Sequence, residues 1–175
     1  MSNARPFLSA LALISIAVWS PFLAAHEQGH REHGVHQHGV GELNVAVEGS
    51  AVHVELITPA ANIVGFEHAP RDAEEEAALR TAIDTLRAGD ALFALSPGAG
   101  CEWVETDVQQ HHDDELHSEF HLTYQFSCRN PSALKHIDVN LFSLFPATER
   151  LITQVISPSS QSALQLTPTA KRIEL

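Results

Sequence analysis

The strongest constraint on the fold is an alternation of apolar with polar or small residues along GELNVAVEGSAVHVELI, residues 41–57. This period-two pattern is typical of half-buried β-strands. A two-residue turn at Gly49–Ser50 would bring the two halves together, with glycine supplying the positive φ. One register then satisfies three apolar pairs, so we predict a β-hairpin. The pairs are Leu43 with Leu56, Val45 with Val54, and Val47 with Val52.

One amphipathic helix is predicted to follow Asp72. Asp72 is a candidate N-cap, and Glu75 stands three residues later, as in a capping box. Three consecutive glutamates from residue 74 suit the positive end of the helix dipole. Gly89 is a natural residue at which to end the helix. The apolar stripe consists of Leu79, Ile83 and Leu86.

The second half of the chain reads mostly as β-strands, separated by breaks that carry proline or serine. Strands, one helix and further strands together predict an α+β fold. In this fold an antiparallel sheet is covered on one face by one main amphipathic helix, within a single domain. The candidate strands are residues 101–108, 118–128, 132–145, 149–157 and 162–168.

Residues 1–25 have the layout of a secretory signal peptide. Arg5 precedes an apolar run from Phe7 to Trp19, and small residues follow it. The run is shorter than the roughly 20 apolar residues that a membrane span needs. We therefore expect a mature chain that begins at His26, lies in the periplasm and has no membrane contact after cleavage.

The two cysteines, Cys101 and Cys128, suit one disulfide in an oxidising compartment. Closing this loop would stabilise the fold by roughly 3 kcal/mol in the chain-entropy model. If the flanking strands pair so that the cysteines face each other, Glu105 falls opposite Tyr124, which requires a bulge or an exposed end. A thiolate metal pair is the alternative.

The composition favours a partner that is a cation. The formal net charge of −12 argues against nucleic acid or an anionic membrane as partner. Twelve histidines add neutral ligands, and most of them lie in two clusters, residues 26–38 and 111–121. Imidazole with an occasional carboxylate is the ligand set of Zn²⁺, and Cu²⁺ and Ni²⁺ also accept it.

The second cluster lies beside an alternating segment. From residue 116 to residue 128 the apolar side chains share one strand face, which places His117, Glu119 and His121 together on the other. Residues two apart on one strand are about 7 Å apart, so convergence needs help from a neighbouring segment. The residues that offer this help are His111, His112, Asp113 and Asp114.

The first cluster contains HEQGH, residues 26–30, which has the spacing of a zinc protease motif. Gly29 and Gly34 interrupt the segment, no apolar stripe would bury it, and the only methionine is Met1, which excludes a Met-turn. We therefore interpret residues 26–40 as a metal-collecting arm that includes His30 and His33. A copper enzyme that chelates its metal with the amine and ring of His26 is a remote alternative.

Several segments resemble the ZrgA-type zinc-regulated periplasmic zinc-binding proteins. They are HQHGVGELNVAVEG, TPAANIVGFEHAP, the acidic helix, the histidine-rich insert and the strand that ends in FSC. The resemblance implies a periplasmic protein that binds zinc and assists a zinc ABC importer. It singles out His36, His38, His68, His111, His112, His117 and His121 as metal ligands.

These interpretations predict a signal peptide (1–25), a histidine-rich arm (26–40) and an α+β zinc-binding domain (41–175) with a histidine-rich hairpin insert (109–121). The expected function is non-catalytic zinc buffering or delivery for import, and the alternative is storage or detoxification of copper or nickel. The predicted metal ligands are His30, His33, His36, His38, His68, His111, His112, His117, Glu119 and His121. His53 and His136 are expected to be ordinary strand histidines.

Overall fold

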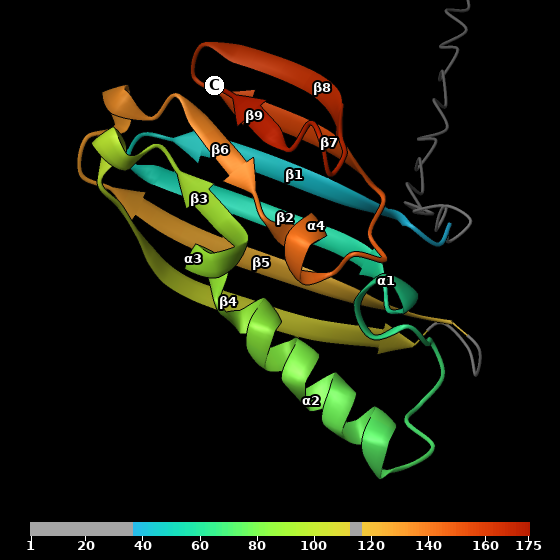
Figure 1. The fold of residues 1–175 in the computed structure, drawn as a ribbon. Coiled ribbons are helices and arrows are strands. Elements are labelled where there is room, and N and C mark those ends of the chain that lie inside the picture. Colours follow the sequence, from blue (N-terminus) through green and yellow to red (C-terminus); the bar gives the residue numbers. More distant parts are fainter. Residues whose placement is uncertain (1–36, 113–116) are drawn as a thin grey trace, which may run out of the picture. The chain divides into compact units, whose positions relative to one another are not determined.

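The computed structural model describes residues 37–112 and 117–175, so the predicted signal peptide and most of the predicted arm lie outside it. The described residues form a large six-stranded sheet and a small three-stranded sheet (Figure 1). The large sheet has the order β4-β5-β2-β1-β7-β8, and its neighbours are antiparallel except β1 and β7. Its strands are β1 (Val40–Glu48), β2 (Ala51–Pro59), β4 (Cys101–His112), β5 (Ser118–Cys128), β7 (Arg150–Ser157) and β8 (Ser160–Leu166).

The small sheet has the antiparallel order β3-β6-β9. It lies over one face of the large sheet, and the helices lie on that same side (Figure 1). The predicted α+β class is confirmed. The remaining elements are α1 (Ala61–Val64), α2 (Ala73–Arg87), α3 (Gly89–Leu92), β3 (Phe93–Leu95), η1 (Pro97–Ala99), η2 (Pro131–Ala133), β6 (His136–Val139), α4 (Leu141–Leu144) and β9 (Arg172–Glu174).

The predicted hairpin forms β1 and β2 in the expected register. Gly49 has a φ of 58°, as the turn requires. The apolar rows continue across the neighbouring strands, so that Val54 lies between Val45 and Tyr124. These side chains are buried against the small sheet and the helices, whereas the alternate residues form an outer face that is mostly polar and includes the exposed Ile152 and Ile156. The outer face of the large sheet is therefore where strand histidines are placed.

Helix α2 begins as predicted. The Asp72 side chain accepts hydrogen bonds from the backbone N–H groups of Glu74 and Glu75, each at 2.9 Å. The prediction for Gly89 needs a correction, because its φ is not positive. A Cβ at Gly89 would lie 2.9 Å from atoms of both Trp103 and Tyr124, so glycine is needed here for close backbone packing.

A disulfide joins Cys101 and Cys128, which are direct partners in the β4/β5 ladder. The register shifts by one residue between Trp103 and Glu105, and this bulge places Thr106 instead of Glu105 opposite Tyr124. The predicted bulge is confirmed, and it keeps the acidic side chains of β4 away from the core.

One predicted strand is wrong in extent. Residues 132–145 contain only the four-residue β6, and Asn140 then leads into α4. Leu141 and Phe142 are both buried, which adjacent residues on one strand cannot both achieve against the same core. A single helical turn points both of them inward.

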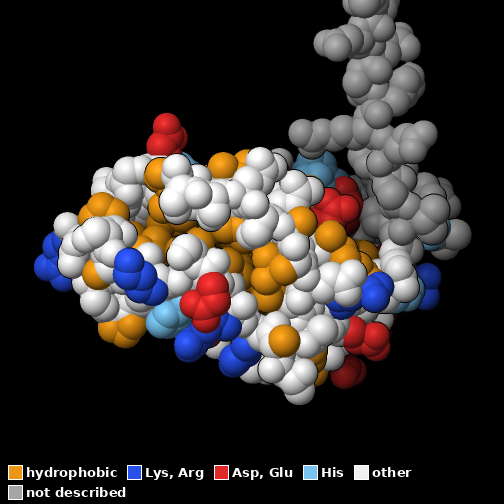
Figure 2. All heavy atoms as spheres, turned by 90° about the horizontal axis from the view of Figure 1, so that it is seen from above, with side chains coloured by type: hydrophobic (Ala, Val, Ile, Leu, Met, Phe, Trp, Pro, Cys, Tyr) orange, Lys and Arg blue, Asp and Glu red, His pale blue; other side chains and the backbone are white. Residues whose placement is uncertain are grey.

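The surface is mixed in character. Figure 2 shows apolar side chains that reach the surface among charged side chains of both signs, so the acidic net charge does not dominate that face. Across residues 37–112 and 117–175, no helix is long and apolar enough to cross a membrane.

Candidate metal centre

The second histidine cluster lies where β4 ends and β5 begins. His111 and Glu119 are direct cross-strand partners, and His121 lies two residues beyond Glu119 on the same face. Strand β4 extends to His112 rather than ending near residue 108 as predicted, so His111 is held by the ladder and not by a loop. The fold therefore places two imidazoles and one carboxylate on one patch of the outer face.

The three side chains contact one another in sequence. Glu119 Oε1 contacts His121 Nε2 directly, and the His111 and His121 ring centroids are 4.4 Å apart with the planes tilted by 54°. Glu119 is buried although it is acidic, His121 is partly buried and His111 is exposed. We call these three residues the hairpin site. Nitrogen and carboxylate oxygen are a zinc ligand set.

The hairpin site is not closed around an ion-sized space. Within the described part of the chain, no three His, Cys, Asp or Glu side chains stand in a geometry that could hold a metal ion. Glu119 and His121 instead contact each other, so a cation must replace this contact and use the same nitrogen and oxygen. The strand pairing brings the three residues together on one face of the hairpin.

Two other residues of the cluster are less well placed for this site. His112 is the partner of Ser118, whose side chain is buried, and therefore lies on the opposite face of β4 from His111. His117 is exposed and lies directly before β5. Asp113 and Asp114 fall outside the described residues.

His38 lies two residues before the start of β1, and its Nε2 is 3.3 Å from Oε1 of Glu67. Sequence reasoning did not identify Glu67. The signal was present, because Glu67 is the only charged residue between Ile57 and His68, in a stretch that otherwise suits burial.

His68 is held by its own loop. Its Nδ1 is 2.9 Å from the carbonyl oxygen of Ala69 and 3.8 Å from Glu75 Oε2, and its ring stacks on Phe66 at a centroid distance of 5.1 Å. A hydrogen bond from Nδ1 to the carbonyl leaves Nε2 as the nitrogen available to a ligand. The predicted ligands His30, His33 and His36 lie outside the described residues.

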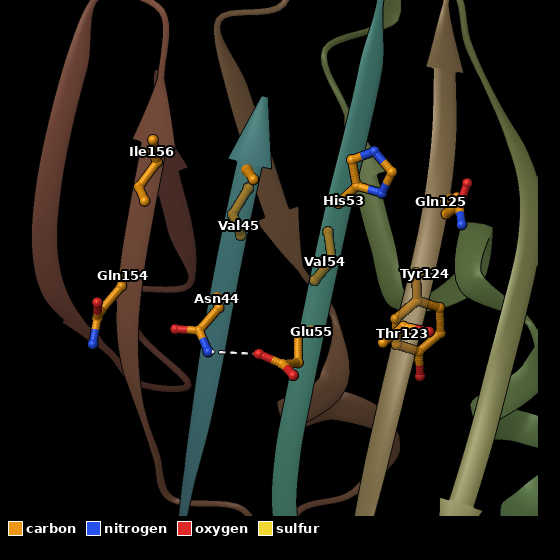
Figure 3. A pocket seen from close by; sticks show the side chains of 11 residues that line it. Asn44, Val45, His53, Val54, Glu55, Thr123, Tyr124, Gln125, Gln154 and Ile156 are labelled. Atoms are coloured by element: carbon orange, nitrogen blue, oxygen red, sulfur yellow. Dashed lines mark hydrogen bonds between the residues drawn. The ribbon is translucent and has the colours of Figure 1, made fainter. Parts of the chain in front are cut away.

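The polar outer face also carries a shallow hollow of about 550 Å³ over β1, β2, β5 and β7. His53 and Glu55 extend from β2 into this hollow, and Glu55 accepts a 2.9 Å hydrogen bond from Asn44 (Figure 3). His53 is exposed. His53 is the only histidine among the residues that line this hollow, as we expect of an ordinary strand histidine.

His136 lies elsewhere, on β6 of the small sheet. Its Nδ1 is 3.4 Å from Ser96 Oγ and its Nε2 is 3.9 Å from Asp138. Ser96 Oγ also donates to the His136 carbonyl and accepts from two backbone N–H groups, so this hydroxyl is committed to holding the strand.

Comparison with protein families gives a match over most of the chain. Residues 35–175 match a family described as ZrgA family zinc uptake protein. A search of curated proteins gave no significant match. The family match spans both described segments, including the hairpin site, His38 and His68, and covers most of the chain. The chain therefore belongs to the ZrgA family of zinc uptake proteins.

Proposed function

We propose that this protein binds zinc at the hairpin site in the periplasm, and that it buffers zinc or delivers it to a zinc ABC importer without catalysing a reaction. The single observation that supports this proposal most is the meeting of His111, Glu119 and His121 on one strand face of a zinc uptake protein. The Cys101–Cys128 disulfide is consistent with an oxidising compartment.

The exposure of the site fits a role in carrying zinc. His121 has 29% of its side chain exposed, and His111 is more open, whereas the Glu119 side chain is 8% exposed. A buried carboxylate gives the ion one fixed ligand, and the exposed imidazoles allow the ion to enter and leave. A structural zinc site would instead be closed by four protein ligands.

Competitive titration of the full chain with Zn²⁺, Cu²⁺ and Ni²⁺ tests the proposal. Glu119→Gln keeps the shape of the side chain but removes its charge, and we expect zinc affinity at the hairpin site to fall about tenfold or more, which is ~1.4 kcal/mol. His111→Gln tests the same site with less risk to the fold, because the His111 side chain is exposed and does not pack in the core. His53→Gln is the matched control on the same outer face and should change nothing. Unchanged zinc affinity in both site variants would refute the hairpin site.

A growth experiment separates uptake from storage. A strain that lacks the protein should grow poorly when zinc is chelated and normally when zinc, copper or nickel is in excess. Restoring wild type should rescue growth, and restoring the His111→Gln variant should rescue it less. Sensitivity to excess copper or nickel alone would favour the alternative function in storage or detoxification.

A further inference from the structure

Strand β8 forms one edge of the large sheet, where it pairs with β7 (Figure 1). Among the residues that the structure describes, no backbone hydrogen bond joins β8 to a strand other than β7. In an antiparallel ladder, every second residue of an edge strand directs its N–H and C=O groups away from the neighbouring strand. Strand β8 therefore presents a row of backbone donors and acceptors with which another strand can pair.

This edge lacks the features with which proteins usually prevent such pairing. These features are charged side chains, proline, a β-bulge and a very short strand. Strand β8 has seven residues, none of them charged or proline, and its ladder with β7 runs without a shift in register. The opposite edge, β4, carries Glu102, Glu105 and Asp107 and contains the bulge after Trp103. Of the two edges of the large sheet, β8 is the one that is open to another strand.

The surroundings of β8 are also uncharged. Residues 151–170, which span most of β7, the turn, β8 and the loop after it, contain no Lys, Arg, Asp or Glu. The outer face of β7 beside this edge carries Ile152, Gln154 and Ile156, all of them exposed. The whole chain has a formal net charge of −12, so two copies of it repel each other. The uncharged edge lets a second copy approach with less repulsion than an acidic edge would.

We propose that two copies of this chain pair through β8, antiparallel and around a twofold axis at Ala163, the middle residue of the strand. This axis places Ala163 opposite the partner's Ala163 and Gln161 opposite the partner's Gln165. The small alanine side chains let the two backbones approach, and each glutamine amide has both a donor and an acceptor for its opposite number. No like charges face each other across the paired strands, which would destabilise the pair. The two large sheets then form one continuous sheet.

This pairing leaves the hairpin site accessible. Strands β4 and β8 are opposite edges of the large sheet, so His111 and Glu119 lie away from the paired strands. The joined sheet carries one hairpin site near each of its two outer edges. The inference goes beyond the proposed function in zinc binding and does not depend on it.

Sedimentation equilibrium of the full chain in EDTA measures the pairing in the absence of zinc, which can bridge histidines of two copies. Wild type should show a monomer–dimer equilibrium. Ala163→Lys should be monomeric at concentrations at which wild type is mostly dimeric, because it places two lysines opposite each other. Gln154→Lys is the matched control, since it adds the same charge at the ladder partner of Ala163, one strand away from the edge, and it should dimerise as wild type does. Both side chains are exposed, so neither substitution disturbs the core.

Ala163→Cys tests the register of the pair. Cys101 and Cys128 are joined in a disulfide and are the only cysteines, so this variant has a single free thiol. Directly opposed residues of an antiparallel pair have Cα atoms about 4.5–5.5 Å apart, a separation that a disulfide spans. Mild oxidation should therefore give a covalent dimer of Ala163→Cys but not of Gln154→Cys. A monomeric wild type in EDTA, a dimer that persists in Ala163→Lys, or an Ala163→Cys variant that does not cross-link would overturn the proposed pairing.

Discussion

The pKa of the Asp138 carboxyl group, on β6, depends on a neighbouring side chain of the small sheet. The Arg172 side chain donates two hydrogen bonds to its carboxylate, at 2.7 and 2.8 Å, and these bonds, together with the positive charge, lower the Asp138 pKa below 3.8. A carboxyl group whose pKa is lower in the folded state stabilises the fold above its unfolded pKa. That contribution is lost as pH falls through the lowered folded pKa.

We predict that Arg172→Gln raises the Asp138 pKa back towards 3.8, because the hydrogen bonds to a charged donor disappear. An NMR titration of the Asp138 carboxyl carbon measures the change directly. Arg80→Gln, which breaks an exposed pair with Glu76 on α2, is the control and should leave Asp138 unchanged. Identical titration curves for wild type and Arg172→Gln would contradict this account.

Tyr124 connects the large sheet to the main helix. Its hydroxyl is buried and donates a 3.0 Å hydrogen bond to the carbonyl of Leu86, and burial raises the pKa of this phenol. Tyr124→Phe keeps the ring in the core but removes the bond, so we expect the free energy of unfolding to fall by about 1 kcal/mol. Urea denaturation measures this loss. Thr123→Ala, the outward-facing neighbour on β5, should change stability by less than about 0.5 kcal/mol.

The β4/β5 hairpin is the element that joins the disulfide to the hairpin site. Cys101 and Cys128 are at one end of the ladder, and His111 and Glu119 are at the other. Strand β4 lies at the edge of the sheet, so only β5 holds it in the ladder. Loss of the disulfide therefore removes the covalent bond that holds the Cys101 end of β4 to β5.

We predict that Cys101→Ser combined with Cys128→Ser lowers the free energy of unfolding by roughly 3 kcal/mol and weakens zinc binding at the hairpin site. Urea denaturation and zinc titration of the double variant beside oxidised wild type give the two quantities. The β1/β2 hairpin should retain its amide protection, because it lies in the centre of the sheet. Equal stability of the oxidised and double-variant proteins would refute the role of the disulfide.

Elements governed by local patterns were predictable from the sequence. The register of β1 with β2, the Asp72 cap and the bulge near Glu105 each follow from residues close together in the chain or from one facing pair. The hairpin site was predictable in part, because alternation placed Glu119 and His121 on one face. The extension of β4 through His111 was not predictable, because QQHH carries no alternation of apolar residues.

Elements governed by distant partners could not be predicted. Strands β3 and β9 have three residues each, which is too short to show a period. The contact between Glu67 and His38 could not be predicted either. The two residues lie far apart in the sequence and meet only because α1 lies beside the start of β1. The signal peptide, the arm and the ligands His30, His33 and His36 remain predictions.

For the whole molecule, zinc binding and folding are linked. An ion that binds the folded state at a hundred times its dissociation constant raises the free energy of unfolding by about 2.7 kcal/mol per site. We therefore expect zinc to raise the urea midpoint of wild type and to raise it less in Glu119→Gln. His53→Gln should respond as wild type does. A midpoint that does not move with zinc in wild type would mean that the folded state does not bind zinc at the hairpin site.

The parallel pairing of β1 with β7 has a consequence for how the protein reaches its native state. Val40 pairs with Arg150 and Ala46 with Ile156, so a central ladder joins the two ends of the folded part. Such high contact order makes folding slow, because a long loop must close before the ladder contributes any stability. Strand β1 keeps one unpaired edge until β7, residues 150–157, has emerged. A nascent or truncated chain would expose that edge, and the strand of another chain could pair with it.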